Sequence, residues 1–312
     1  MESFYIAFNA VAPISFLVIF GYYLKEKKYL AKETISNLNK LCFNIFLPVL
    51  TFSNILHTNV REIFDIKLYI YVFISIIAMV VALSMIVPFI EPDSKKQGAL
   101  IQGIYRSNFV ILGIPLTNHI AGNAGAFVAS ILIMVVIPMY NMLAVIVLAT
   151  HSGRNTDLKN VLKEIIRNPL IIASILAIIL SLLNVKVPQF VDKIILDLAK
   201  IGSVLPMIML GSMLDFKKIS SNIRNIFIGV LGRLILVPLI FLTIAIALGF
   251  SSEKIVALIA MYCAPTAVSS ALMAEQMGCD YELAAQIIIF TTVISCFTIF
   301  LWVFTLDFLK FI

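Results

Sequence analysis

Runs of about 20 predominantly apolar residues recur along this 312-residue chain. A helix needs about 20 such residues to cross the roughly 30 Å of hydrocarbon in a bilayer. Charged residues make up only 13% of the chain, too few to cover a soluble protein of this size. The pattern predicts an all-α polytopic membrane protein with ten spans, at residues 4–24, 35–57, 66–90, 98–121, 123–149, 168–185, 189–214, 223–249, 253–278 and 280–308.

Basic residues fall mainly in the loops that follow odd-numbered spans. Lys and Arg accumulate in cytoplasmic loops, so we expect a multi-pass protein of the cell membrane with both termini outside. The 23 Lys and Arg residues exceed the 17 Asp and Glu residues. In short loops this excess orients the spans in the bilayer and does not indicate nucleic-acid binding.

The longest polar stretch, residues 151–168, divides the chain into five spans plus five. We expect a first repeat at 1–150, a cytoplasmic linker at 151–167 and a second repeat at 168–312. Because each half has an odd number of spans, the second must insert upside down relative to the first. Prolines in matching spans support this inverted repeat: Pro13 with Pro169, Pro48 with Pro206, Pro88 with Pro238, and Pro115 with Pro265.

Two spans are interrupted by residues that disfavour a continuous helix. Residues 107–122 contain Gly113, Ile114 and Pro115, and residues 258–278 contain Pro265. Because proline lacks the amide hydrogen that a helix uses, we expect breaks near Gly113 and somewhere in 264–270, with Ser270 available as an N-cap. Unpaired backbone groups are tolerated in a membrane only where protein or a wet cavity covers them.

Each break would leave a half-helix whose N-terminal amides and partial positive charge point at the centre of the membrane. Two such ends form an anion site without a buried lysine. The alternative is that the polar side chains only hold helices together. The predicted substrate-binding residues are Asn108, Gly113, Ile114, Pro115, Asn118, Pro265, Thr266, Ser269 and Ser270.

Four further polar residues have two interpretations each. Glu275 and Gln276 follow the second break, and an acid inside a span usually faces a partner or a pathway. They are candidates for coupling to Na⁺ or H⁺, unless Glu275 already lies at the cytoplasmic interface. Arg106 and Arg233 could attract an anion or extend to the headgroups along their own stems, and we expect the latter for Arg106.

No cofactor is expected, and the cysteines and histidines lack the spacing of a metal site. Enzyme motifs such as H-E-x-x-H and G-x-S-x-G are absent from the sequence. These observations favour a secondary transporter. The alternatives are a ligand-binding membrane receptor or a channel without active transport.

Several short motifs resemble the auxin efflux carrier family. They are Leu38-Asn39-Lys40-Leu41 leading to Phe46-Leu47-Pro48, Asn108 seven residues before Pro115, Arg167-Asn168-Pro169, and Ala264-Pro265 followed by Ala274-Glu275. This family includes plant auxin transporters and bacterial carriers of malate, malonate and similar organic acids. The resemblance covers nearly the whole chain.

The resemblance implies the inverted-repeat fold of sodium/proton antiporters and bile-acid symporters. Spans one, two, six and seven would form a dimerising scaffold. Spans three to five and eight to ten would form a mobile domain, in which broken helices four and nine cross. Asn108 matches the substrate-contacting Asn of the family, and Pro115 and the region 265–270 match its crossover prolines. We therefore expect a homodimeric carrier of mono- or dicarboxylates, or auxin-like acids, that works by an elevator mechanism.

Overall fold

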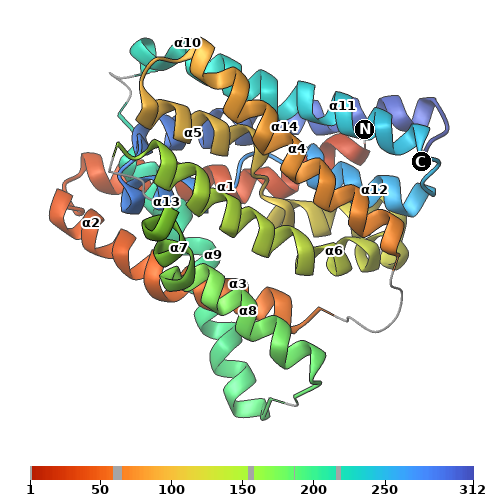
Figure 1. Ribbon diagram of the computed structural model, residues 1–312, viewed down its shortest axis with the longest axis horizontal. Coiled ribbons are helices and arrows are strands. Elements are labelled where there is room, and N and C mark those ends of the chain that lie inside the picture. The colour runs from red at the N-terminus through yellow and green to blue at the C-terminus, as the bar shows by residue number, and fades with distance from the viewer. Residues whose placement is uncertain (1, 59–64, 154–157, 186, 216–218) are drawn as a thin grey trace.

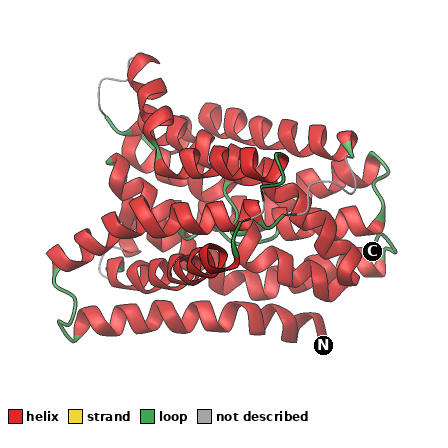
Figure 2. Ribbon diagram, turned by 90° about the horizontal axis from the view of Figure 1, so that it is seen from below, coloured by secondary structure: helices red, strands yellow, loops and turns green. Residues whose placement is uncertain are grey.

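The computed structural model describes residues 2–58, 65–153, 158–185, 187–215 and 219–312 as helices joined by short loops (Figures 1 and 2). Apart from one isolated bridge, these residues form no strand. The helices, with η marking wide π-type turns, are α1 (Glu2–Glu26), α2 (Lys32–Leu41), η1 (Cys42–Phe46), α3 (Leu47–Leu56), α4 (Ile66–Ile90), α5 (Ser94–Tyr105), η2 (Phe109–Gly113), α6 (Ile114–His151), α7 (Leu158–Arg167), α8 (Pro169–Leu182), α9 (Gln189–Met213), α10 (Ile219–Leu231), η4 (Gly232–Leu236), α11 (Val237–Ala247), α12 (Ser252–Tyr262), α13 (Ser269–Met277) and α14 (Tyr281–Phe308).

Six helices of the described residues are long and apolar enough to cross a membrane. The bent pair of α7 and α8, which meet at 59°, adds a seventh if it forms one span. Large apolar side chains cover the outer surface, as at Phe89, which is 91% exposed. An apolar outer surface of this kind fits a bilayer. The all-helical, multi-pass character is therefore confirmed, while the ten-span inverted repeat stays a prediction.

Among the described residues, three wide turns interrupt the regular helices, and each precedes a proline. Pro48, Pro115 and Pro238 occupy the second positions of α3, α6 and α11, directly after η1, η2 and η4. Proline cannot donate to the carbonyl of the preceding turn, and its ring clashes with that carbonyl. A π turn relieves the clash while the chain stays helical, and such turns are frequent at functional sites.

The helices fall into two packed sets. The first set consists of α1, α2, η1, α3, α8 and α9, and the second consists of α4, α5, η2, α6 and α10 to α14 with η4. Helix α7 connects the two sets, because it contacts both α6 and α8. Figure 1 shows α3 and α8 at one edge of the molecule and α10 and α11 at the opposite edge. The sets meet where α1 packs against α14 and where α6 packs against α8.

Glycines let α1 and α9 approach closely within the first set. A Cβ atom on Gly21 would lie 1.8 Å from the carbonyl oxygen of Ile208. A Cβ on Gly211 would lie 1.8 Å from the carbonyl oxygen of Val18. Small residues of this kind are typical of helix contacts in membranes. The hydrophobic effect does not hold helices together in lipid, so van der Waals contact between closely packed backbones stabilises them instead.

The boundary between the fourth and fifth expected spans is visible inside α6. Ala121 and Gly122 have non-helical backbone angles there, with φ of 59° at Gly122. The linker is partly helical, because α7 occupies 158–167. This helix was not expected from the sequence, although Val161, Leu162 and Ile165 show its apolar periodicity. Asn168 then caps α8 by accepting from the amides of Leu170 and Ile171.

Candidate functional site

Two extended segments cross at the centre of the second set. Residues 106–108 separate α5 from η2, and residues 263–268 separate α12 from α13. Ser107 and Thr266 form an antiparallel bridge. The backbone N–H of Asn108 donates to the backbone carbonyl of Pro265 at 2.7 Å. The backbone N–H of Ala267 donates to the backbone carbonyl of Arg106 at 3.1 Å. The backbone groups freed by the two breaks therefore partner each other.

The first break lies upstream of the expected position. Gly113 has right-handed helical angles, and the chain is wide-turn helix from 109 to 113. The expectation of a break near Gly113 was wrong, because the π turn lets the helix continue although Pro115 has no amide hydrogen to donate. The break occurs where pairing with the other segment satisfies the backbone.

The second break was placed correctly within 264–270, since α12 ends at Tyr262 and α13 begins at Ser269. The expected cap was wrong. Val268 holds the N-cap position without a side-chain cap bond, and Ser270 lies one residue inside the helix. The bridge between the segments already sets the direction of α13, so the helix begins without a serine cap.

Arg233 joins the C-terminal ends of the two half-helices α5 and α12. It is fully buried, and its guanidinium donates to five backbone carbonyls, those of Ile104, Tyr105, Met261, Tyr262 and Ala264, at 2.8–3.1 Å. A guanidinium has five N–H groups, so every donor is used. Each helix C-terminus carries roughly half a negative charge. One arginine therefore balances both ends.

A cavity of about 100 Å³ lies beside the crossover, between the two helix sets. Helices α3, α8 and α9 of the first set face the N-terminal ends of η2 and α13 across it. Arg106 is the only charged residue among its described lining residues. The described lining residues are Leu47, Leu50, Thr51, Asn54, Arg106, Ser107, Asn108, Phe109, Val110, Ile111, Val136, Ile137, Tyr140, Asn141, Leu170, Gly202, Ser203, Pro206, Ala267, Val268 and Ser269.

Arg106 is buried and does not reach a headgroup layer, so the expected extension to the surface was wrong. Its Nη2 donates to Oδ1 of Asn141 at 2.6 Å, and its Nη1 donates to the sulfur of Met273. These partners come from α6 and α13. The side chain turns inward because a buried guanidinium must be hydrogen-bonded, and both partners lie inside the second set.

The predicted binding residues divide into three groups. Asn108 and Ser269 line the cavity. Gly113, Pro265, Thr266 and Ser270 belong to the crossover or its half-helices, but are not among the described lining residues. Thr266, for example, donates its hydroxyl to the Gly103 carbonyl at 2.5 Å. Asn118 is exposed away from the cavity, and the side chains of Ile114 and Pro115 lie outside the described residues.

Sequence reasoning did not assign several polar residues to this site. Tyr140 and Asn141 come from α6, Thr51 and Asn54 from α3, and Ser203 from α9. Nothing in their local sequence separates them from polar residues that only join helices. The pairing of the two breaks could have indicated them, because the helices beside a crossover form the opposite wall of its cavity.

The chain matches a known protein family over most of its length. A model described as membrane transport protein matches residues 6–303. The chain belongs to this family. It is the auxin efflux carrier family that the sequence resembles.

Two archaeal members of the family are similar over nearly their whole length. An uncharacterized transporter of Methanothermobacter thermautotrophicus is 25% identical over 302 residues, which cover 94% of this chain and 96% of that protein. An uncharacterized transporter of Methanocaldococcus jannaschii is 24% identical over 311 residues, covering 95% and 98%. Family and relatives together make this protein a membrane transport protein.

The candidate ion-coupling residues lie away from the cavity of this transport protein. Glu275 is half-buried on α13 and accepts from Nδ2 of Asn39 on α2 at 2.6 Å. Gln276 lines a separate, open cavity of about 550 Å³ beside Lys163 and Arg167. The described residues contain no group of three His, Cys, Asp or Glu side chains that could hold a metal ion.

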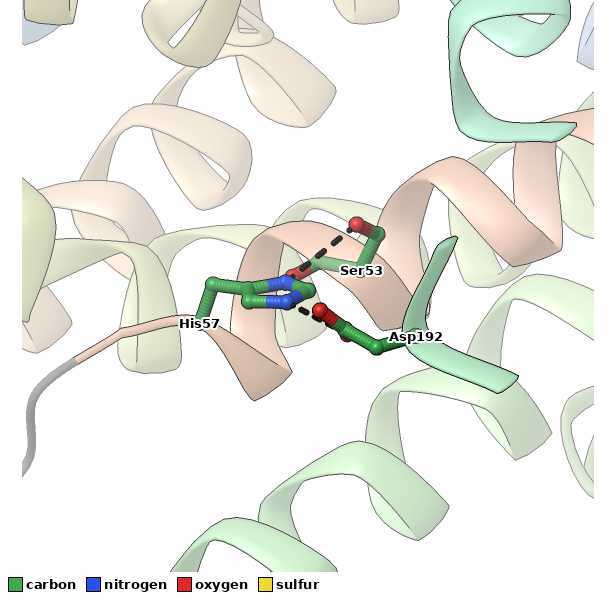
Figure 3. Close-up of polar contacts among 3 residues, drawn as sticks. All are labelled: Ser53, His57 and Asp192. Atoms are coloured by element: carbon green, nitrogen blue, oxygen red, sulfur yellow. Dashed lines mark hydrogen bonds and ion pairs between the residues drawn. The ribbon is translucent and has the colours of Figure 1, made fainter. Parts of the chain in front are cut away.

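A second polar cluster joins α3 to α9 within the first set (Figure 3). Nε2 of His57 lies 2.9 Å from a carboxylate oxygen of Asp192, and Nδ1 lies 2.7 Å from the Ser53 carbonyl. The Ser53 hydroxyl is 3.4 Å from the same Nδ1. Because Nδ1 donates to a carbonyl, it cannot act as a base for Ser53. The cluster is a helix-to-helix contact and not a Ser-His-Asp nucleophile.

Proposed function

We propose that this membrane transport protein is a secondary carrier of small organic anions, namely mono- or dicarboxylates such as malate, or auxin-like acids. The observation that carries the proposal is the cavity at the crossover. Arg106 is its only charged residue among those described, and two half-helices begin at its wall. Helix N-termini and a guanidinium both favour a negatively charged ligand.

The size of the cavity favours the smaller acids. Pockets for drug-sized ligands usually enclose about 300–1,000 Å³. The cavity here, about 100 Å³, suits a molecule of only a few carbon atoms. Its wall is largely apolar, with Leu47, Leu50 and Val136 among its side chains. A short aliphatic carboxylate would match both the charge and the apolar surface.

The position of the cavity between the two helix sets supports an elevator-type movement. In this mechanism the first set is the scaffold, and the second set carries the crossover and its anion across the membrane. The scaffold would also form a homodimer in the cell membrane, with both termini outside. Ten spans in two inverted repeats, 1–150 and 168–312 around the linker, would make the outward and inward states equivalent.

Transport in reconstituted liposomes tests the proposal. Labelled acetate, lactate, malonate, malate and an auxin are offered with pH and sodium gradients varied separately. We expect saturable uptake of at least one acid, stimulated by the unlabelled acid on the opposite side. Flux without saturation or counter-stimulation would favour a channel. An acid that stabilises the protein but never crosses would favour a receptor, and neither binding nor flux with any acid would exclude the proposal.

Two asparagines of the same interrupted span give a matched pair of variants. Asn108 lines the cavity, whereas Asn118 is exposed away from it. We expect Asn108→Ala to lower the apparent affinity by at least tenfold, because a hydrogen bond to a charged group is worth about 1.5–3 kcal/mol. Asn118→Ala should transport like the unchanged protein. Equal behaviour of the two variants would contradict Asn108 as a substrate contact.

A further inference from the structure

We propose that Asn141 binds the transported anion directly and that Arg106 is the residue that positions it. This inference rests on the proposed carrier function and adds to its site a side-chain donor from α6. Neither residue belongs to the binding set expected from the sequence. Their contact brings the fifth expected span into a site otherwise formed by the two crossing segments.

The contact with Arg106 fixes which way the Asn141 amide points. A guanidinium carries only donors, so the atom of Asn141 that faces it must be the oxygen. Nη2 of Arg106 lies 2.6 Å from that oxygen. The amide nitrogen is therefore the end directed away from Arg106. The orientation follows from the chemistry of the pair, although oxygen and nitrogen of an amide have nearly the same shape.

The nitrogen of Asn141 is left without a hydrogen-bond partner among the described residues. Asn141 is 1% exposed, and its buried Nδ2 donates no hydrogen bond to any residue that the structure describes. Leaving such a donor unpaired costs free energy, because the group has given up its hydrogen bond to water. A residue that lines the cavity and bears this cost is suited to a ligand that supplies an acceptor.

A carboxylate is the ligand that this donor and its surroundings fit. Carboxylate oxygens only accept, so one oxygen would take the hydrogen of Nδ2. The Arg106 bond withdraws electron density from the amide and makes Nδ2 a stronger donor. The N-terminal ends of η2 and α13 border the same cavity and add partial positive charge. The amide donor, the guanidinium and the two helix ends all belong to residues that line the same cavity.

Asn141→Asp separates a binding role from a structural one. The aspartate keeps an oxygen that accepts from Arg106, but it replaces the donor with an acceptor and adds a negative charge. We expect the purified variant to remain at least as stable as the unchanged protein without ligand. Acids of the liposome panel should no longer raise its thermal unfolding temperature. Asn141→Ala, which also lacks the donor, should bind at least about tenfold more weakly.

Asn222→Asp is the matched control. Asn222 is also buried, its oxygen accepts from Lys96 at 3.0 Å and its nitrogen donates to Gln286 at 2.9 Å, yet it is not among the described lining residues. The substitution makes the same change of charge on the same helix set. We expect this variant to retain both ligand stabilisation and transport.

The positioning role of Arg106 is tested by a double variant. Arg106→Lys keeps the charge but loses the planar fork, and should weaken binding. Combined with Asn141→Ala it should weaken binding no further than Asn141→Ala alone, because the two residues act through one donor. Additive losses would overturn the positioning role.

The outcomes distinguish the inference from the function on which it rests. If the unchanged protein and both Asn141 variants are stabilised alike by an acid, the inference is wrong and the carrier proposal stands. If no acid of the panel stabilises or crosses with the unchanged protein, the carrier proposal fails and the inference fails with it. If the acid stabilises the unchanged protein and Asn222→Asp but not the Asn141 variants, both the inference and the carrier proposal are supported.

Discussion

Asn39 donates a hydrogen bond of 2.6 Å to the carboxylate of Glu275, and this bond joins the two helix sets. Asn39 lies near the end of α2 in the first set, and Glu275 lies in the half-helix α13 of the second. Any sliding of one set past the other must break this bond. A carboxylate that changes partners during such a movement is well placed to take up an ion when Asn39 leaves it.

Glu275→Gln tests whether this carboxylate couples transport to an ion. The glutamine still offers an oxygen to Asn39 but has no charge for Na⁺ or H⁺. We expect substrate exchange to continue while the dependence of uptake on pH or sodium disappears. Glu33→Gln removes an exposed acid of α2 and should leave that dependence intact. If uptake by the unchanged protein responds to neither ion, Glu275 has no coupling role and the protein is a uniporter.

Arg233→Lys tests the hydrogen bonds that Arg233 donates to the ends of α5 and α12. A lysine has three donors for the five carbonyls that Arg233 satisfies. At least two buried carbonyls would lose their partner, each at a cost of about 1–3 kcal/mol. We expect a clear fall in the thermal unfolding temperature in detergent. Arg224→Lys, at an exposed position of α10, is the control. Equal unfolding temperatures for the two variants would contradict the role given to Arg233.

Composition and apolar periodicity predicted the helical membrane fold, and prolines predicted which spans are interrupted. The register of the first break was not predictable, because a π turn absorbs the effect of Pro115 and long-range pairing of Asn108 with Pro265 decides where the helix stops. The burial of Arg233 was also not predictable from the sequence. Its partners are backbone carbonyls of α5 and α12, which lie far from Arg233 in the sequence. Every residue type has such a carbonyl, so no sequence pattern marks these partners.

Gly211→Ala tests the close contact of α1 with α9. The new methyl group would lie 1.8 Å from the Val18 carbonyl oxygen, so the helices must separate. Overpacking of this kind costs about 1–3 kcal/mol or more, and we expect lower yield and a lower unfolding temperature. Gly229→Ala is a graded comparison, since its methyl would meet only the Ile287 side chain at 3.1 Å. A larger loss in Gly229→Ala would count against the proposed contact.

Asp65 provides a prediction on pH. It caps α4 through the Leu68 amide and pairs with Lys254 of α12. The hydrogen bond from Lys254 is the main reason that the pKa of Asp65 lies below its ordinary 3.8, with burial opposing it and the cap bond assisting. A lowered carboxyl pKa stabilises the fold above the ordinary value, and this stabilisation is lost as pH falls through the lowered one.

The fall in stability below about pH 4 should therefore be shallower in Asp65→Asn than in the unchanged protein. Asparagine still caps a helix, but it has no carboxyl group to titrate and cannot form an ion pair with Lys254. Unfolding temperatures measured from pH 6 to pH 3 provide the comparison. Parallel curves would show that the pair contributes nothing to acid stability.

The two buried arginines of the crossover differ in what offsets their charge. Arg233 is balanced by the two helix ends that it joins, whereas Arg106 is bonded to the neutral amide of Asn141 and the sulfur of Met273. In the proposed movement Arg106 would travel through the membrane's electric field. Each elementary charge moved fully across 100 mV changes the free energy by about 2.3 kcal/mol. Arg233 would move with it, because helix ends offset a charge locally but add no net charge. A bound monoanion would lower the charge that moves by one, so voltage would act differently on the loaded step and on the empty return step.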